Sequence, residues 1–129
     1  MNKICTSIEQ SQKLIVGIDI KTADMCWSID IPDLPTLLAY PITDCDNWEN
    51  KIPAWSLSAL LDLIPPYLGE FKDGIDFGFS KSVNGKWYSA HYLQLDNSGL
   101  ATFTKTVTGD TAIDSAFEMV CWLKENKKL

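Results

Sequence analysis

The segment from residue 75 to residue 107 constrains the fold more than any other part of the sequence. At its start, apolar residues alternate with polar or small ones, at Ile75, Phe77 and Phe79. Asn84-Gly85 is typical of a tight type I′ hairpin turn, and the residues from Asp96 to Gly99 are typical of a second turn. Three runs joined by two turns predict a three-stranded antiparallel meander over residues 75–107, with one face packed against other elements.

A helix is predicted in the N-terminal region, over residues 7–16. Thr6 and Glu9 match a capping box, in which a hydroxyl and a carboxylate accept hydrogen bonds from the first free backbone N–H groups. Gly17 followed by Ile18 is typical of a helix end, where glycine takes the left-handed conformation and a hydrophobic contact follows. These two patterns predict where the helix starts and ends.

Two further helices are predicted, one in the centre of the chain and one at its C-terminal end. Ser56 is a typical N-cap for the central helix, which Pro65 and Pro66 end sharply. Asp110 or Thr111 can cap a helix near the C-terminal end, and Thr111 with Asp114 resembles a second capping box. The C-terminal helix that follows carries an apolar stripe at helical spacing, formed by Ile113, Ala116, Phe117, Val120 and Leu123.

One or two strands are predicted between the first two helices. Residues 25–31 alternate between apolar and polar types, and residues 37–40 are a possible second strand. Residues 43–53 are polar and acidic without a period, which predicts a surface loop. The predicted fold class is therefore α+β. An antiparallel sheet, made of the three-stranded meander and these N-terminal strands, packs with the N-terminal, central and C-terminal helices.

Length and composition predict a single α+β domain over residues 1–129, since 46% of the residues are apolar and 22% are charged. The apolar run Leu57–Ile64 is far shorter than the roughly 20 residues that cross a bilayer. Residues 9–13 are polar where a secretory signal needs an apolar region. We therefore expect a cytoplasmic protein without a membrane segment. Its cysteines have no metal-binding spacing and are expected to be reduced thiols, at Cys5, Cys26, Cys45 and Cys121.

The charges of the chain argue against nucleic acid as a partner. The formal net charge is −6, from 17 acidic and 11 basic residues, and every basic residue is a lysine. Arginine supplies the forked donor that recognises phosphate and guanine, and this chain has none. An acidic surface attracts cationic partners instead, so the sequence favours a basic protein as the partner.

Four segments spread along the chain carry a resemblance to a known group of proteins: Cys5–Ser11, Thr22–Met25, Pro53–Leu61 and Asp114–Leu123. In these segments the sequence resembles small, functionally uncharacterised proteins encoded in prophages and other mobile elements of gut bacteria. The resemblance implies a cytoplasmic protein of mobile-element origin. It implies no catalytic or ligand-binding residues.

Neither a catalytic triad nor a metal site is indicated by the residues that could form one. His91 is the single histidine, and any arrangement with a histidine base would have to use it. Its place in a predicted strand favours an ordinary surface or hydrogen-bonded residue. The acidic cluster of Asp44, Asp46 and Glu49 offers oxygen ligands for calcium, but Trp48 and Glu49 stand where a calcium loop needs an oxygen donor and a glycine. We expect a solvated acidic loop and no cofactor.

Trp48 is the residue of this loop that most favours a binding function. Tryptophan in an acidic loop without an apolar period, if exposed, is typical of an interface residue that dominates binding energy. Simple packing of the loop onto the core is the alternative. Most of the other tryptophans are predicted to be in the core, because each buries a large apolar area. The candidate binding residues are therefore Trp48, Asp44, Asp46 and Glu49.

Three functions remain open at this point. The first is a non-enzymatic protein–protein interaction or accessory protein of a mobile element, which binds a basic protein through the acidic loop and its aromatic residue. The second is a small-molecule-binding module or small enzyme, with His91, Tyr92 and Asp76 in a pocket near the sheet. The third is a structural subunit that oligomerises. The sequence does not identify the partner or the oligomeric state.

Overall fold

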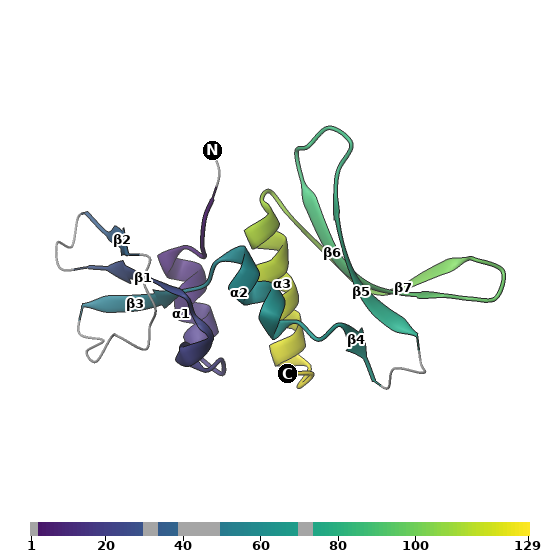
Figure 1. Cartoon of the computed structure of the whole chain (residues 1–129), viewed down its shortest axis with the longest axis horizontal. Helices are drawn as coiled ribbons and strands as arrows, with labels where there is room; N and C mark the ends of the chain where they lie inside the picture. The colour runs from purple at the N-terminus through teal and green to yellow at the C-terminus, as the bar shows by residue number, and fades with distance from the viewer. Residues whose placement is uncertain (1–2, 30–33, 39–49, 70–73) are drawn as a thin grey trace.

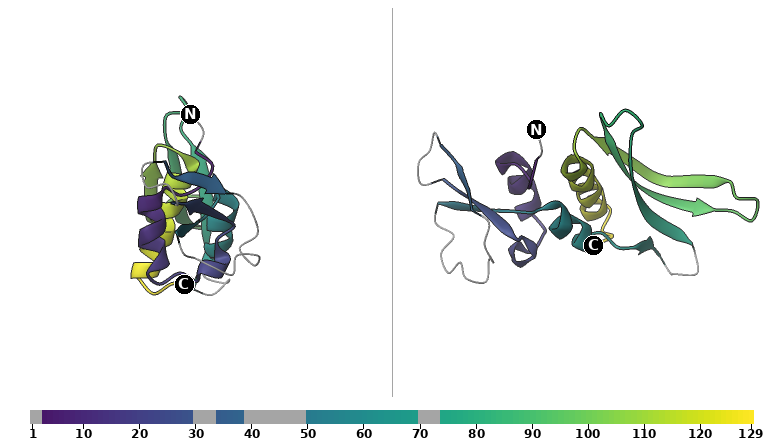
Figure 2. Two further views of the ribbon diagram at one scale, coloured as in Figure 1. Left: turned by 90° about the vertical axis from the view of Figure 1, so that its left-hand side faces the viewer. Right: turned by 45° about the horizontal axis from the view of Figure 1, so that its top comes forward.

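Two antiparallel sheets lie on opposite sides of a central layer of helices in the computed structural model of the protein (Figure 1). The structure describes residues 3–29, 34–38, 50–69 and 74–129. The right-hand view in Figure 2 shows the same layered arrangement, with α1 beside the first sheet and α3 beside the second. The α+β class predicted from the sequence is confirmed, but the strands form two sheets where one was predicted.

The element bounds follow the chain in a simple order. The helices are α1 (Ile8–Ile15), α2 (Leu57–Leu63) and α3 (Ala112–Glu125), with a short 3₁₀ helix, η1 (Ile20–Thr22). The first sheet has the order β2-β1-β3, with β1 (Met25–Ser28), β2 (Thr36–Leu38) and β3 (Lys51–Ala54). The second has the order β4-β5-β6-β7, with β4 (Tyr67–Leu68), β5 (Ile75–Lys81), β6 (Tyr88–Leu95) and β7 (Ala101–Gly109).

The N-terminal helix is confirmed, but its capping box lies one residue later than the sequence predicted. Ser7 is the N-cap, and its hydroxyl accepts a hydrogen bond from the Gln10 backbone N–H at 3.1 Å. The Gln10 side chain in turn accepts from the Ser7 N–H at 3.0 Å. Thr6 is fully buried instead, where its hydroxyl bonds Ser11 and accepts from the Trp55 N–H. The prediction that Thr6 and Glu9 cap the helix is therefore wrong.

The predicted cap of α2, Ser56, is confirmed, and of the two caps considered for α3 the structure has Thr111 rather than Asp110. The Ser56 hydroxyl accepts from the Ala59 N–H, and the Thr111 hydroxyl accepts from the Asp114 N–H. The apolar stripe of α3 is buried along its length, at Ile113, Ala116, Phe117, Val120 and Leu123. Because α2 has only seven residues, its stability depends on packing against α3 rather than on helix propensity.

The first sheet contains a strand that the sequence analysis assigned to a loop. β3 pairs antiparallel with β1, so that Cys26 lies opposite Pro53. Proline lacks a backbone N–H and is tolerated in a sheet at an edge, and β3 is an edge strand. Residues 39–49 lie outside the described part of the chain, including most of the predicted loop.

The predicted meander is confirmed, with β4 added as a fourth strand. Its first turn is not the two-residue turn expected at Asn84-Gly85. Six residues, from Ser82 to Trp87, connect β5 to β6, and Gly85 alone in this loop has a positive φ, of 71°. The Gly85 N–H donates to the Ser82 carbonyl, and the register of β6 against β7 shifts between Tyr92 and Leu93.

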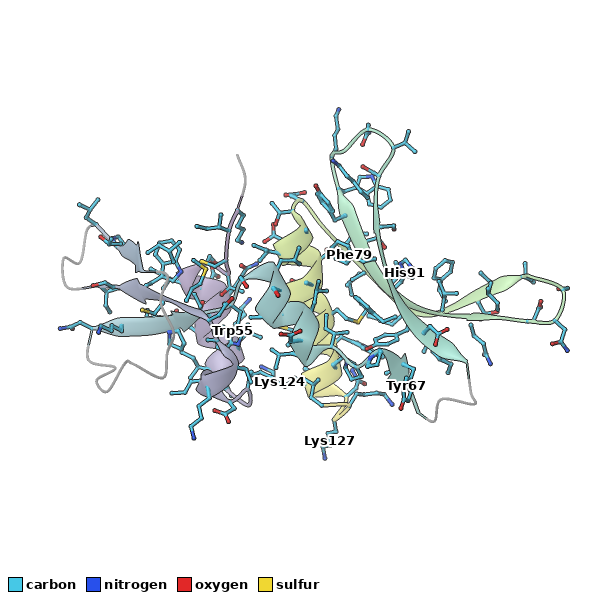
Figure 3. The ribbon with its side chains drawn as sticks, viewed as in Figure 1. Trp55, Tyr67, Phe79, His91, Lys124 and Lys127 are labelled. Carbon is cyan, nitrogen blue, oxygen red and sulfur yellow. The ribbon has the colours of Figure 1, made fainter. Side chains whose placement is uncertain are left out.

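One hydrophobic core joins the three helices to the second sheet, and it also includes Trp55, the residue that follows β3 of the first sheet. Trp55, which follows β3, and Tyr92, in the middle of β6, are its largest fully buried side chains. Figure 3 shows Trp55 between the first sheet and the helices, well separated from His91 in the second sheet. Among the described residues, no helix is long and apolar enough to cross a membrane.

Two lysines connect the N-terminal part of the chain to α3. The Lys3 ammonium lies 2.7 Å from a carboxylate oxygen of Asp114, at the first turn of α3. Lys124, near the other end of α3, donates to the Lys13 carbonyl at 2.9 Å, where it faces the negative end of the α1 dipole. These contacts hold α1 along α3.

Candidate functional site

The four residues predicted from the sequence to bind a partner, Trp48, Asp44, Asp46 and Glu49, lie outside the described residues. Their role stays a prediction. Within the described ranges, the features that can form a site are cavities, exposed aromatic residues and uncompensated charges.

The residues proposed for a pocket near the sheet do not converge. Successive side chains of a strand point to opposite faces, so His91 and Tyr92 lie on different sides of β6. Tyr92 is buried beside α3, its hydroxyl donates to the Pro65 carbonyl at 2.7 Å, and burial raises its pKa to about 12. His91 packs instead against Phe103, with 5.4 Å between ring centroids, and Asp76 is exposed. No cavity described below is lined by His91, Tyr92 or Asp76.

The contact between His91 and Gly78 explains why β5 carries a glycine in its interior. These residues face each other across β5 and β6. A Cβ atom on Gly78 would lie 2.3 Å from the His91 Nε2 atom, so the imidazole ring occupies the space of a side chain. Aromatic rings that cover glycine in this way stabilise sheets. The position of His91 is explained by packing.

A cavity of about 370 Å³ lies where β7 leads into α3, and it combines an exposed aromatic ring with several carboxylates. We call it the Trp87 pocket. It is lined by Gln10, Trp87, Thr108, Gly109, Asp110, Asp114 and Glu118. The pocket therefore brings together α1, the β5–β6 loop, the end of β7 and the first turns of α3.

Trp87 is held at the edge of this pocket by the backbone of the β5–β6 loop. The Ser82 hydroxyl accepts hydrogen bonds from the Lys86 and Trp87 N–H groups, at 3.0 and 3.1 Å. The Ser82 N–H donates to the Trp87 carbonyl at 2.9 Å. The Trp87 side chain is nevertheless 46% exposed, so it is not among the tryptophans that the core buries. A fixed backbone with an exposed indole is the arrangement of an interface residue.

Asp114 is the carboxylate of the Trp87 pocket whose charge is already neutralised. It accepts hydrogen bonds from Lys3 at 2.7 Å and from Gln10 at 2.9 Å, and Thr111 donates to its second oxygen. Burial opposes ionisation, but the hydrogen bonds from Lys3, Gln10 and Thr111 and the Lys3 charge outweigh it and lower the pKa of Asp114. This network fixes the wall of the pocket.

Asp110 and Glu118 are the carboxylates that leave the pocket negatively charged. Both are exposed, and within the described ranges neither forms an ion pair. Glu118 lies four residues after Asp114, so both project from the same side of α3. Two uncompensated carboxylates beside an indole ring make a site for a cation, because the face of the ring attracts positive charge as well.

Gly109 allows β7 and α3 to approach closely enough to form this pocket. A Cβ atom there would lie 2.5 Å from the Ser115 backbone nitrogen and 2.8 Å from the Asp114 Cβ atom. Both neighbours belong to α3 and cannot move without moving the helix. Any larger residue would therefore separate the end of β7 from the helix.

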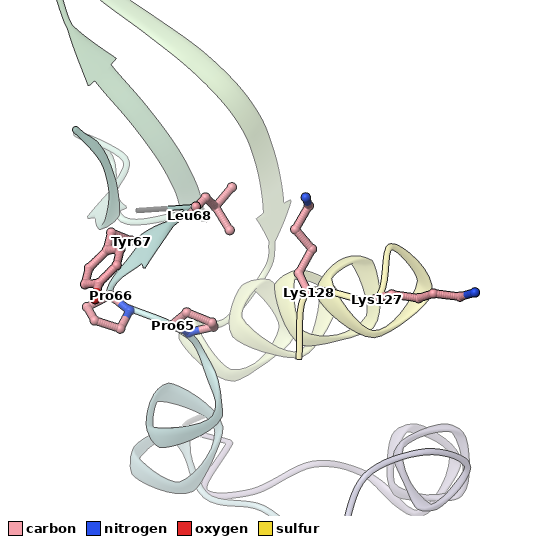
Figure 4. A pocket seen from close by; sticks show the side chains of 7 residues that line it. Pro65, Pro66, Tyr67, Leu68, Lys127 and Lys128 are labelled. Atoms are coloured by element: carbon pink, nitrogen blue, oxygen red, sulfur yellow. The ribbon is translucent and has the colours of Figure 1, made fainter. Parts of the chain in front are cut away.

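A second cavity, of about 460 Å³, lies between the connection from α2 to β4 and the end of α3 (Figure 4). Pro65, Tyr67 and Leu68 line one side, and Lys127 and Lys128 line the other. Figure 4 shows the two lysine side chains pointing in different directions. Their ammonium groups do not meet at one point, so the cavity lacks the convergent donors that an anion needs.

Several of the polar groups that line a third cavity, of about 580 Å³, are already paired, whereas Asp110, which also lines the Trp87 pocket, has no ion pair among the described residues. This cavity lies between the first turns of α2 and α3. Ser56 bonds Asp24, and Thr111 bonds Asp114. Lys3 is held by Asp114 and Gln10, so it is not available to a ligand. A fourth cavity, of about 330 Å³, is mostly apolar and lies beside Cys5 and Trp27.

The cysteines in the described ranges are free thiols. They are Cys5, Cys26 and Cys121. Burial raises the pKa of the Cys5 thiol to about 11, and burial also raises the pKa of Cys121. A thiol with a raised pKa is a poor nucleophile near neutral pH. In the described part of the chain, no group of three or more potential ligands could hold a metal ion.

Comparisons with known proteins found no match, either among protein-family models, among curated proteins or among solved structures.

Sequence reasoning did not identify the Trp87 pocket. The sequence analysis predicted that Trp87 belongs to a strand and that Asp114 takes part in a helix cap. It considered Asp110 as an alternative cap of the same helix and assigned no role to Glu118. The sequence does show Trp87 directly after a turn and Asp110 just before the C-terminal helix. What brings them together is the pairing of Tyr88 with Gly109, which depends on the register of the sheet.

Replacing Asp114 by asparagine is expected to lower the free energy of unfolding by about 1 kcal/mol at pH 7, since it removes a partly exposed ion pair and a charge at a helix start. The pKa of Asp114 is lowered in the folded state. Its contribution is therefore complete above the unfolded carboxyl pKa of about 3.9 and is lost as the pH falls through the folded value. Urea unfolding of both proteins from pH 7 down to acid should show their difference closing, whereas a difference independent of pH would contradict this. Asp110→Asn is the control.

Proposed function

We propose that the protein is a non-enzymatic protein–protein interaction protein, an accessory protein of a mobile element, and that its partner is a basic protein. The observation that carries this proposal is the Trp87 pocket, where Trp87 is 46% exposed beside the unpaired carboxylates of Asp110 and Glu118. The mobile-element context is supported by the resemblance of four segments of the sequence, and a cytoplasmic location goes with it.

The chemistry of the pocket favours a lysine or arginine side chain as the bound group. A cation near the face of an indole ring contributes roughly 0.5–2 kcal/mol, depending on how far it is removed from water. The carboxylates of Asp110 and Glu118 add charge-assisted hydrogen bonds. Tryptophan also supplies the apolar area on which the methylene part of a long basic side chain can pack.

The size of the pocket favours a side chain of a protein over a small-molecule ligand. Its volume of about 370 Å³ is near the lower limit of roughly 300–1,000 Å³ for ligand sites, and its walls are mainly polar. A site for a small molecule is typically larger and mostly apolar. The net charge of −6 would also steer a basic partner toward the protein, at a rate that falls as salt increases.

The proposal can be tested with a phage library of random dodecapeptides displayed against the folded protein. We expect the selected peptides to be enriched in lysine and arginine. Glu118→Lys and Trp87→Ala should each weaken binding of a selected peptide by at least tenfold, which corresponds to about 1.4 kcal/mol.

Matched controls separate the pocket from general electrostatics. Glu125→Lys makes the same change of charge as Glu118→Lys at an exposed position of the same helix, outside the pocket. Phe103→Ala removes another exposed aromatic residue, which is 56% exposed. Both controls should bind the peptide nearly as the original protein does. Selection of peptides without basic residues, or equal losses for Glu118→Lys and Glu125→Lys, would refute the proposal.

A further inference from the structure

The edge of the second sheet is open along β7. β7 is nine residues long and, in the described part of the chain, pairs on one side alone, with β6. Side chains along it are exposed, at Thr102, Phe103, Thr104, Thr106 and Thr108. Every edge strand presents backbone N–H and C=O groups that a further strand can pair with. An edge of this length is a template for another extended segment.

The features by which proteins usually protect such an edge are weak in β7. Proline and short length are common protections, and β7 has neither. Lys105 is its single charged residue, and the Lys105 ammonium lies 5.8 Å from the centroid of the Trp122 ring of α3. That amine is therefore occupied on the face of the sheet rather than at its edge. The shift of register affects the first half of β7, so Lys105–Gly109 pairs regularly with β6.

The open edge of β7 leads directly into the Trp87 pocket. Thr108 and Gly109 belong both to β7 and to the lining of the pocket. A segment paired along β7 would therefore end beside Thr108 and Gly109, at the border of the Trp87 pocket. In peptide recognition by strand addition, backbone hydrogen bonds supply affinity and a pocket for particular side chains supplies specificity.

We propose that the basic partner binds as an added β-strand along β7, with a lysine or arginine side chain at one end of the strand in the Trp87 pocket. This inference rests on the proposed function and adds the mode of binding. The occupant is an extended segment of a basic protein, because the end of the edge is negatively charged and has no described cation to balance Asp110 or Glu118. It is not a second copy, because β7 offers only Lys105 as a cation and each copy carries a charge of −6.

The probe is an acetylated and amidated peptide of sequence KTVTQTV, titrated to millimolar concentration into the full ¹⁵N-labelled protein. Two analogues are compared with it. One replaces the lysine by norleucine, and the other carries N-methyl groups on alternate backbone nitrogens, which removes the donors of one edge. Amide hydrogen exchange along β7 and the chemical shift of the Trp87 indole N–H are measured.

We expect the peptide to shift the Trp87 indole resonance and to slow hydrogen exchange of amides within Ala101–Gly109. The N-methylated peptide should bind at least tenfold more weakly. The norleucine peptide should lose affinity toward the original protein and toward Glu125→Lys, but not toward Glu118→Lys. This last comparison assigns the basic end of the peptide to the pocket.

The outcomes distinguish a failure of this inference from a failure of the proposed function. A shift of the Trp87 indole without slower exchange along β7, and equal binding of the N-methylated peptide, would overturn strand addition and leave the pocket as a site for basic side chains. Slower exchange along β7 with equal affinity of the lysine and norleucine peptides would overturn the role of the pocket. Absence of both effects at millimolar peptide would refute this inference.

Discussion

Replacing Trp55 by alanine is expected to lower the free energy of unfolding by about 3–5 kcal/mol, the usual effect of removing a large aromatic side chain from a core. Trp55 is completely buried and follows β3 at the junction between the first sheet and the helices. Its indole N–H donates to the Thr22 hydroxyl at 2.9 Å, and its backbone exchanges two hydrogen bonds with Thr6. The substitution removes the packing and leaves the Thr22 hydroxyl without this donor.

Urea unfolding followed by circular dichroism measures this effect. Trp55→Phe keeps most of the apolar volume but loses the hydrogen bond to Thr22, so its loss should be smaller. Trp87→Ala is the control, since Trp87 is exposed and its substitution should change stability by about 1 kcal/mol or less. A Trp55→Ala protein as stable as Trp87→Ala would contradict the position of Trp55 at the centre of the core.

Replacing Gly109 by alanine is expected to lower the free energy of unfolding by about 1–3 kcal/mol, although only one methyl group is added. That methyl carbon would lie 2.5 Å from the Ser115 backbone nitrogen, inside van der Waals contact. Either β7 or α3 must move, and α3 is the helix whose apolar stripe fills the core. The same movement would separate Asp110 and Glu118 from Trp87.

Thermal or urea unfolding of Gly109→Ala should be compared with that of Thr108→Ala. Thr108 is the exposed neighbour of Gly109 in β7, so its substitution tests strand propensity without the close approach. Changes of strand propensity amount to about 1 kcal/mol or less. If the two variants lose the same stability, then close packing of Gly109 against α3 is not the reason for a glycine at this position.

The helices could be predicted almost completely from the sequence, because caps and apolar spacing are local patterns. Ser56 occupies the cap position that the sequence predicted, and Thr111 is one of the two caps that the sequence allowed for the last helix. The error at the first helix, Thr6 in place of Ser7, arose because both hydroxyls precede an acceptor at the right spacing. Ser7 is the cap because Thr6 is buried and its hydroxyl bonds Trp55, which is 49 residues away in the chain.

The separation into two sheets could not be predicted from the same patterns. Strand spacing shows which residues alternate, but it does not show which strands are partners. β1 pairs with β3, a strand with a proline in its middle, and β4 has only two residues. Neither β3 nor β4 has enough alternating residues for a periodic pattern to reveal it as a strand. The meander was predictable because its turns keep consecutive strands adjacent.

The Trp87 pocket could not be predicted from local sequence patterns either. A two-residue turn at Asn84-Gly85 would have placed Trp87 within the strand, whereas Ser82 organises a six-residue loop that exposes it. The carboxylates lie in α3 and just before it, 23 to 31 positions later in the sequence, and tertiary pairing alone brings them beside the indole. An acidic surface was predictable from composition, but the position of the Trp87 pocket was not.

The position of α3 in the chain has a consequence for how the protein is made. Residues of α3 cover β6 and β7 on one side and α2 on the other, yet every strand precedes this helix in sequence. During synthesis from the N-terminus, Tyr92 and Leu60 therefore leave the ribosome before the surface that buries them exists. The nascent strands must stay unaggregated until residues Ala112–Glu125 have emerged from the ribosome. The threonine-rich sequence of β7 makes the surface of the sheet partly polar during that time.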